Sequence, residues 1–164
     1  MQLSLPSVPM PYRLQHARPE HRALLQRIYI CQRERELRGF GWSSDQCRLF
    51  LELQWRARNA SYAAQYPDAL DQIIVRYELP VGHLLTAEAP GTLRLVDVAL
   101  LPEYQNRGLG ARVLRDLQRA CAGKGQTIVL SVACDNPARE LYARLGFVAV
   151  AGDEMYTRME WAGS

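Results

Sequence analysis

The sequence lacks the residue spacings that mark a metal site or a disulfide framework. Its cysteines, Cys31, Cys47, Cys121 and Cys134, form no CxxC pair and are too few and too scattered for a small disulfide scaffold. Its three histidines show no HExxH or related ligand spacing. We therefore expect no bound metal, and cysteines that are reduced and mostly buried.

Long apolar runs and dense basic runs are also missing. No segment approaches the ~18–20 apolar residues that cross a bilayer, and the first residues have prolines and no basic start of the kind a signal peptide needs. Lysine and arginine are scattered, and the net charge is only +3, so no footprint for a nucleic-acid backbone is present. These absences predict a cytoplasmic protein without a membrane or nucleic-acid partner.

Repeats and low-complexity segments are absent as well. The 164 residues are 48% hydrophobic and 23% charged, which is the composition of an ordinary globular protein about one domain long. We expect a single domain over residues 1–164, with an irregular, proline-containing lead-in over residues 1–11.

Hydrophobic periodicity predicts a mixed α/β fold. In chain order we expect a strand over 12–17, a helix from Pro19, a helix from Ser44 to about residue 65, strands over 72–78, 81–89 and 92–101, a helix over 109–122, a strand over 127–133, a short helix from Asn136–Pro137 to Gly146, and strands over 147–150 and 155–161. Ser43 and Gln46 have capping-box spacing at the second helix. The three middle strands have tight connections, so they predict an antiparallel meander.

The stretch "EYQNRGLGARVL" places Gly108 and Gly110 at the start of a helix. Glycine lets a ligand approach the backbone, and a helix N-terminus offers unpaired N–H groups and a positive dipole, so this pattern predicts a phosphate or pyrophosphate site. A turn that merely needs positive φ is the alternative. Val113 stands where a dinucleotide fingerprint needs glycine, and "GKGQT" at 123–127 precedes a strand, so we interpret it as a helix stop.

Residues 93–147 together resemble the GCN5-related N-acetyltransferase (GNAT) superfamily. The resemblance consists of a strand, a proline turn, Q-x-x-G-x-G, a long helix, a strand and then "NPARELYARLGF", and by element order it extends over about 70–161. Ala138 stands one step earlier than in the schematic family pattern. Two separated motifs at the right distance are more specific than either one alone.

The resemblance implies a central mixed, mostly antiparallel sheet with flanking helices, splayed between strands 93–100 and 127–133 to admit acetyl-CoA. It also implies the cofactor-binding residues. The pantetheine arm would pair with the backbone of Val98, Ala99 and Leu100, the pyrophosphate would lie on the loop formed by Gln105, Asn106, Arg107, Gly108, Leu109, Gly110 and Ala111, and Asn136 would touch the cofactor arm.

The chemistry of amine acetylation selects two further residues. Attack on a thioester needs a neutral amine and a proton for the departing thiolate. The resemblance places Tyr142 near the sulfur, where its phenol can supply that proton. Some relatives have a glutamate on the second wedge strand, but Ser131 and Ala133 stand there, so Asp97 on the first strand is the nearest candidate base, with a purely structural role equally open.

These observations predict an acetyl-CoA-dependent transferase that acetylates a primary amine by direct attack. The acceptor stays open among a small amine, a peptide N-terminus, a lysine side chain and an amino-sugar, as does a homodimer. The absent strand glutamate motivates one alternative, a non-catalytic acyl-CoA-binding or sensor domain. A nucleotide-binding phosphate loop is a second alternative.

Overall fold

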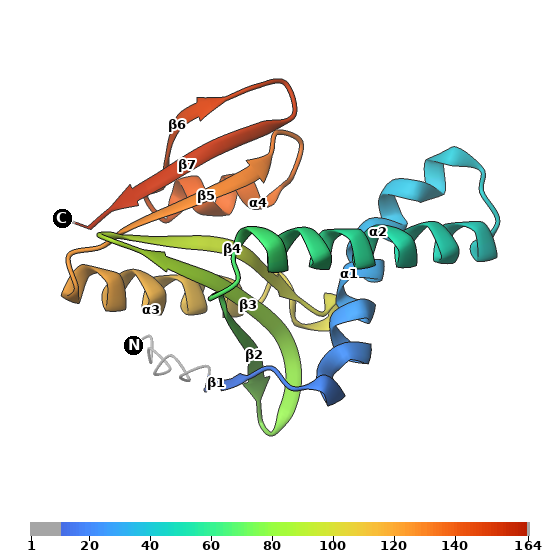
Figure 1. Ribbon diagram of the computed structural model, residues 1–164, viewed down its shortest axis with the longest axis horizontal. Coiled ribbons are helices and arrows are strands. Elements are labelled where there is room, and N and C mark those ends of the chain that lie inside the picture. Colours follow the sequence, from blue (N-terminus) through green and yellow to red (C-terminus); the bar gives the residue numbers. More distant parts are fainter. Residues whose placement is uncertain (1–10, 164) are drawn as a thin grey trace, which may run out of the picture.

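The computed structural model describes residues 11–163, apart from the side chains of residues 35, 36 and 38. Most of the predicted lead-in over residues 1–11 therefore lies outside the described residues. Within them the fold is a twisted sheet with helices on both faces (Figure 1). No helix in this part of the chain is both long and apolar enough to cross a membrane.

The sheet has seven strands in the order β1-β2-β3-β4-β5-β7-β6. They are β1 (Arg13–His16), β2 (Leu70–Arg76), β3 (Leu79–Ala89), β4 (Thr92–Leu100), β5 (Thr127–Ala133), β6 (Val148–Gly152) and β7 (Tyr156–Ala162). Every neighbouring pair is antiparallel except β4 and β5, which are parallel. The expected meander and the mixed, mostly antiparallel sheet are confirmed.

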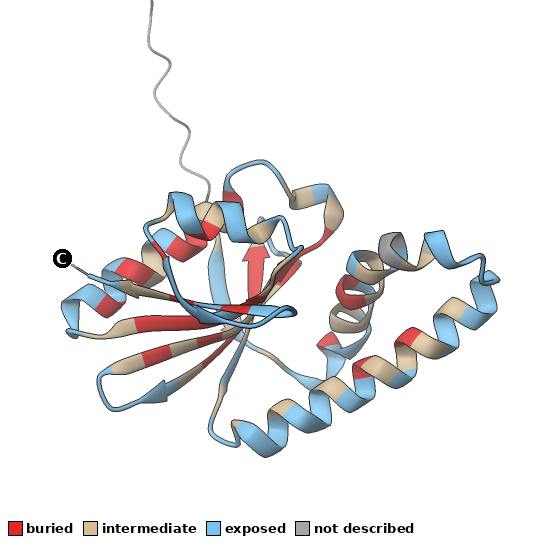
Figure 2. Cartoon of the chain, turned by 90° about the horizontal axis from the view of Figure 1, so that it is seen from above, coloured by how far each residue is buried: buried red, intermediate tan, exposed pale blue. Residues whose placement is uncertain are grey.

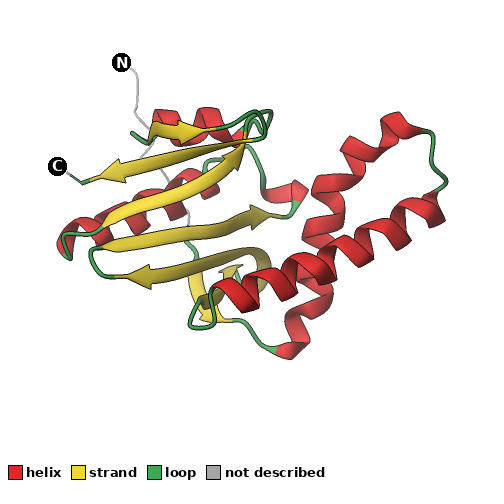
Figure 3. Cartoon of the chain, turned by 45° about the horizontal axis from the view of Figure 1, so that its top comes forward, coloured by secondary structure: helices red, strands yellow, loops and turns green. Residues whose placement is uncertain are grey.

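The helices are α1 (Arg22–Leu37), α2 (Ser44–Gln65), α3 (Leu109–Gly123) and α4 (Ala138–Arg144), with short 3₁₀ turns at Pro19–His21, Arg38–Phe40 and Pro102–Tyr104. The predicted capping box starts α2: Ser43 Oγ accepts from Gln46 N at 3.2 Å, and Gln46 Oε1 accepts from Ser43 N at 3.0 Å. The α1–α2 turn projects past the ends of the strands (Figure 3).

The two faces of the sheet are covered by different helices. The largest apolar cluster joins α3 and α4 to one face and includes Leu84, Leu100, Val113 and Tyr142. On the other face Ile28 of α1 packs against Ala99, and Leu51 and Trp55 of α2 pack near Tyr29. Buried residues accordingly follow the middle of the sheet and the inward sides of the helices (Figure 2). Strand β4 is thus covered on both faces.

Two local expectations need correction. The four cysteines are free, but only Cys121 is buried; Cys31, Cys47 and Cys134 are half-buried, because they lie on helix sides or a strand end that the core does not cover. Helix α4 begins at Ala138 with Pro137 as its N-cap, one residue after the predicted start. Asn136 still caps, because its Oδ1 accepts from Ala138 N at 2.9 Å.

Candidate functional site

Strands β4 and β5 separate halfway along their length. They pair from Thr92 with Thr127 to Leu95 with Leu130, and beyond that β4 pairs only with β3 and β5 only with β7. The β3–β4 register shifts between Leu95 and Asp97, so Val96 is an extra residue at the point of separation. A bulge bends the strand that carries it. The expected opening between these two strands is therefore present.

A row of unpaired backbone N–H groups follows β4. From Asn106 to Ala111 no backbone N–H donates a hydrogen bond to any acceptor among residues 11–163, and the first such bond is from Arg112 N to Gly108 O at 3.0 Å. Asn106 (φ 58°) and Gly108 (φ 87°) adopt left-handed conformations. Such turns and a helix N-terminus both turn successive N–H groups toward one side, which makes an anion site.

The two glycines of this loop have different reasons to be glycine. Gly108 has the positive φ that glycine adopts without strain, so the turn alone explains it. Gly110 is helical, and an added Cβ would meet only Leu100 Cδ1, at an ordinary 3.8 Å. Nothing among the described residues requires glycine at position 110. Packing and φ therefore do not explain the glycine at position 110, whereas a ligand lying against the backbone there would.

The other predicted cofactor residues surround this row. Ala99 points to the α1 side of β4, while Val98 and Leu100 pack into the cluster on the α3 side. Gln105 donates from Nε2 to Leu100 O at 2.9 Å, which fixes the corner between β4 and the loop. Arg107 and Asn136 are exposed.

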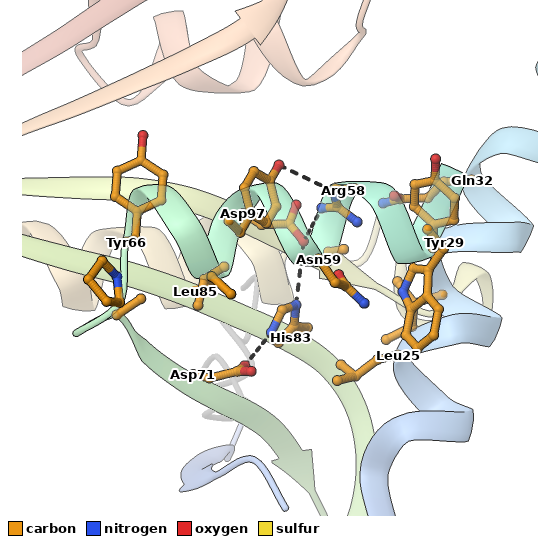
Figure 4. A pocket seen from close by; sticks show the side chains of 17 residues that line it. Leu25, Tyr29, Gln32, Arg58, Asn59, Tyr66, Asp71, His83, Leu85 and Asp97 are labelled. Carbon is orange, nitrogen blue, oxygen red and sulfur yellow. Dashed lines mark hydrogen bonds and ion pairs between the residues drawn. The ribbon is translucent and has the colours of Figure 1, made fainter. Parts of the chain in front are cut away.

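A pocket of about 360 Å³ lies on the opposite side of β4, between α1, α2 and strands β2–β4. Its base carries a chain of charged contacts (Figure 4): Arg58 Nη2 lies 2.6 Å and His83 Nδ1 3.4 Å from Asp97 Oδ2, and His83 Nε2 contacts Asp71 Oδ1. Arg58 Nε also donates to Tyr62 Oη at 3.2 Å. Four different elements therefore meet at Asp97 and His83.

The pKa shifts of Asp97 and His83 follow from these contacts. Burial opposes charge on both Asp97 and His83, but their mutual contact and those with Arg58 and Asp71 outweigh it. The pKa of Asp97 is consequently lowered, and the pKa of His83 is raised to about 9. At neutral pH this group of four side chains holds two cations and two carboxylates.

Tyr142 lies on α4, packed edge-on against Phe147 with ring centroids 5.6 Å apart. It is 8% exposed. Burial first, and then the charge of Asp97, raise its pKa to about 12, so the phenol keeps its proton throughout the neutral range. The structure therefore brings the two predicted catalytic residues, Asp97 and Tyr142, within electrostatic reach of each other.

Comparison with known proteins agrees with this geometry. The model of the FR47-like protein family matches residues 81–158, from β3 to β7. The solved structure of PaiA N-acetyltransferase from Thermoplasma acidophilum, in complex with coenzyme A, superposes with a TM-score of 0.71 at 16% identity, covering 93% of this chain and 99% of that one. The chain therefore has the GNAT fold.

Two further GNAT-fold structures show the same similarity. The ribosomal-protein-S18-alanine N-acetyltransferase from Escherichia coli has a TM-score of 0.62 at 21% identity, covering 94% of this chain and 95% of that one. An acetyltransferase from Thermus thermophilus has a TM-score of 0.65 at 21% identity, covering 92% of this chain and 96% of that one. At these identities the shared property is the fold.

The sequence predicts the loop of the GNAT fold, but it does not predict the chain of charged contacts at the base of the pocket. Asp71, His83 and Arg58 belong to no motif, and the sequence alone favours a structural or surface role for His83. A signal existed in the register: His83 and Asp97 are polar positions on facing strands, and both point to the sheet face that α1 and α2 cover. Polar residues on a covered face need partners.

The charged contacts between Arg58, Asp97, His83 and Asp71 predict that the stability of the protein depends on pH. The contacts that raise the pKa of His83 from 6.5 to about 9 stabilise the fold fully below pH 6.5, and this contribution is lost as pH rises through about 9. The His83 side chain is 14% exposed, so we expect the loss to reach about 3 kcal/mol.

Urea unfolding at pH 6, 8 and 10 measures this contribution as the difference between the unmodified protein and His83→Gln. The difference should shrink steeply between pH 8 and 10. His16→Gln, at an exposed position of β1, is the matched control and should leave the profile unchanged. A difference that is the same at pH 6 and 10 would contradict the assignment of a charged His83.

Proposed function

We propose that the protein transfers an acetyl group from acetyl-CoA to a primary amine. The observation that carries this proposal is the row of unpaired N–H groups from Asn106 to Ala111 at the mouth of the gap between β4 and β5. The coenzyme A complex of the PaiA N-acetyltransferase, which has the same fold, supports it.

Coenzyme A fits the residues present. Its diphosphate would lie on the N–H groups from Asn106 to Ala111, where Gly110 leaves room for it. Its pantetheine arm would run between the separated strands along Val98, Ala99 and Leu100, with Asn136 on the β5 side. The group that the cofactor supplies when bound is an activated acetyl thioester.

The acceptor would occupy the pocket on the other side of β4, because Asp97 belongs both to that pocket and to the strand that borders the gap. Arg58 and His83 hold its carboxylate ionised and fixed. We propose that this carboxylate accepts a hydrogen bond from the amine and orients its lone pair toward the acetyl carbon. Its lowered pKa makes it a weak base, so the proton passes on to water.

Tyr142 would complete the reaction from the α4 side. As the new N–C bond forms and the C–S bond breaks, negative charge would develop on sulfur; the buried phenol would donate its proton there and regain one from water. We expect Tyr142→Phe to lower kcat about a hundredfold and to leave the Kd for acetyl-CoA nearly unchanged. Steady-state thiol release and calorimetry measure the two quantities.

Tyr156→Phe is the matched control for that variant, because Tyr156 is exposed on β7. Its kcat should equal that of the unmodified protein. If Tyr142→Phe turned over as fast as Tyr156→Phe, the role of Tyr142 as the acid would be wrong.

The function itself is tested by adding acetyl-CoA and a panel of amines and following thiol release. Acceptor-dependent release supports the transferase. Tight coenzyme A binding without release for any amine supports the acyl-CoA-binding or sensor domain, an alternative favoured by the ion pairs that hold Asp97. Thermal protection by ATP but not by coenzyme A would contradict both.

A further inference from the structure

The charged groups at the base of the pocket balance one another. Arg58 and His83 carry positive charges, and Asp71 and Asp97 carry negative ones, all joined in one chain of contacts. The phenol of Tyr62 also contacts Arg58. A pocket that selected a polycation would need surplus negative charge. The four charged side chains at the base of this pocket have no net charge when taken together.

One atom in this group of charged side chains, Oδ1 of Asp97, is left for a ligand. Arg58 and His83 both contact Oδ2 of Asp97, and Oδ1 has no hydrogen-bond donor among residues 11–163. The side chain is 20% exposed, and the residue lines the pocket. A carboxylate oxygen in that position can accept hydrogen bonds from an N–H group of a ligand that enters the pocket.

Most of the residues that line the pocket around these charged groups are apolar or aromatic, and the amides of Gln32 and Asn59 lie among them. Leu25 and Tyr29 of α1, Trp55 and Tyr66 on the α2 side, and Leu85 of β3 surround the charged chain (Figure 4). The volume of about 360 Å³ suits a small molecule. Burying a second ammonium against such walls costs desolvation that no unpaired carboxylate among the described lining residues would offset. The paired carboxylate of Asp71 has a side chain that is 46% exposed, so solvent weakens its attraction.

We propose that the acceptor is a small amine with a single amino group on an apolar or aromatic carbon skeleton, held by Asp97 Oδ1. This inference rests on the proposed transferase function and names the substrate class of the same site. It selects among the small amine, peptide, lysine and amino-sugar acceptors that the sequence leaves open.

Matched pairs of amines test the proposal. n-Butylamine and 1,4-diaminobutane differ only in the second amino group, and we expect the monoamine to have a kcat/KM at least about tenfold higher. 2-Phenylethylamine should be acetylated faster than n-butylamine, since its ring fills more of the apolar wall. Phenylalanine has the same ring with a carboxylate added, so its rate shows whether the natural source is a free amine or an amino acid.

A charge placed on the pocket wall provides a second test. Ala63 and Ala64 are both exposed residues of α2. Ala63 lines the pocket, and Ala64 does not. Ala63→Glu should raise kcat/KM for 1,4-diaminobutane relative to n-butylamine about tenfold. Ala64→Glu adds the same charge to the same helix and should leave that ratio unchanged.

The outcomes separate this inference from the function on which it rests. If no amine releases thiol, the transferase proposal fails, and calorimetric titration of the same amines into the coenzyme A complex still measures the preference of the pocket. Weaker binding of 1,4-diaminobutane than of n-butylamine would uphold the inference in that case. Faster acetylation, or tighter binding, of the diamine, of glucosamine or of a short peptide than of 2-phenylethylamine overturns it.

Discussion

Gly110→Trp is expected to abolish coenzyme A binding while leaving the fold intact. The added Cβ meets only Leu100 Cδ1 at 3.8 Å, and replacing a helical glycine favours the helix. The indole would fill the space in front of the N–H groups of α3. We expect the Kd for acetyl-CoA to rise at least about a hundredfold, or about 2.7 kcal/mol, and the thermal protection by coenzyme A to disappear.

Gly123→Trp is the control for this experiment. Gly123 ends the same helix, and an added Cβ has no neighbour within 4 Å. Its coenzyme A affinity and its melting temperature without ligand should match those of the unmodified protein. Equal coenzyme A affinity in the two tryptophan variants would mean that the ligand does not lie at the start of α3.

The fold could be predicted from the sequence because its signals are local. The change of period after Asp71, the capping box at Ser43 and the proline after Leu101 each act within a few residues. The strand over 127–133 has the predicted bounds, and α3 ends one residue later than predicted. The start of α4 differs from the prediction by one residue because Asn136 and Pro137 compete for the same capping position.

The candidate site could be predicted only where it is local. The loop from Gln105 to Ala111 is contiguous, and its backbone N–H groups act regardless of side chain. The acceptor pocket instead combines residues far apart in the sequence, such as Arg58 and Asp97, and their meeting depends on strand register and on how α2 crosses the sheet. Periodicity reports which face of an element is apolar but not which polar residues on two elements will meet.

Asp97→Asn should cause the largest loss of turnover. The amide keeps the shape of the side chain but removes the charge that binds the amine and balances Arg58 and His83. We expect kcat/KM for the amine to fall about 10²–10⁴-fold, with the Kd for acetyl-CoA unchanged. The two cations left without their partner should also lower the free energy of unfolding, by about 1–3 kcal/mol.

The loss of stability and the loss of turnover can be separated by a second substitution. In Arg58→Gln/Asp97→Asn one of the two cations beside position 97 is removed as well, so the free energy of unfolding should partly recover relative to Asp97→Asn alone. Turnover should stay low, because the carboxylate oxygen that receives the amine is still absent. If turnover recovered together with stability, Asp97 would be a structural partner of Arg58, and the amine would have to be oriented by another group in the pocket.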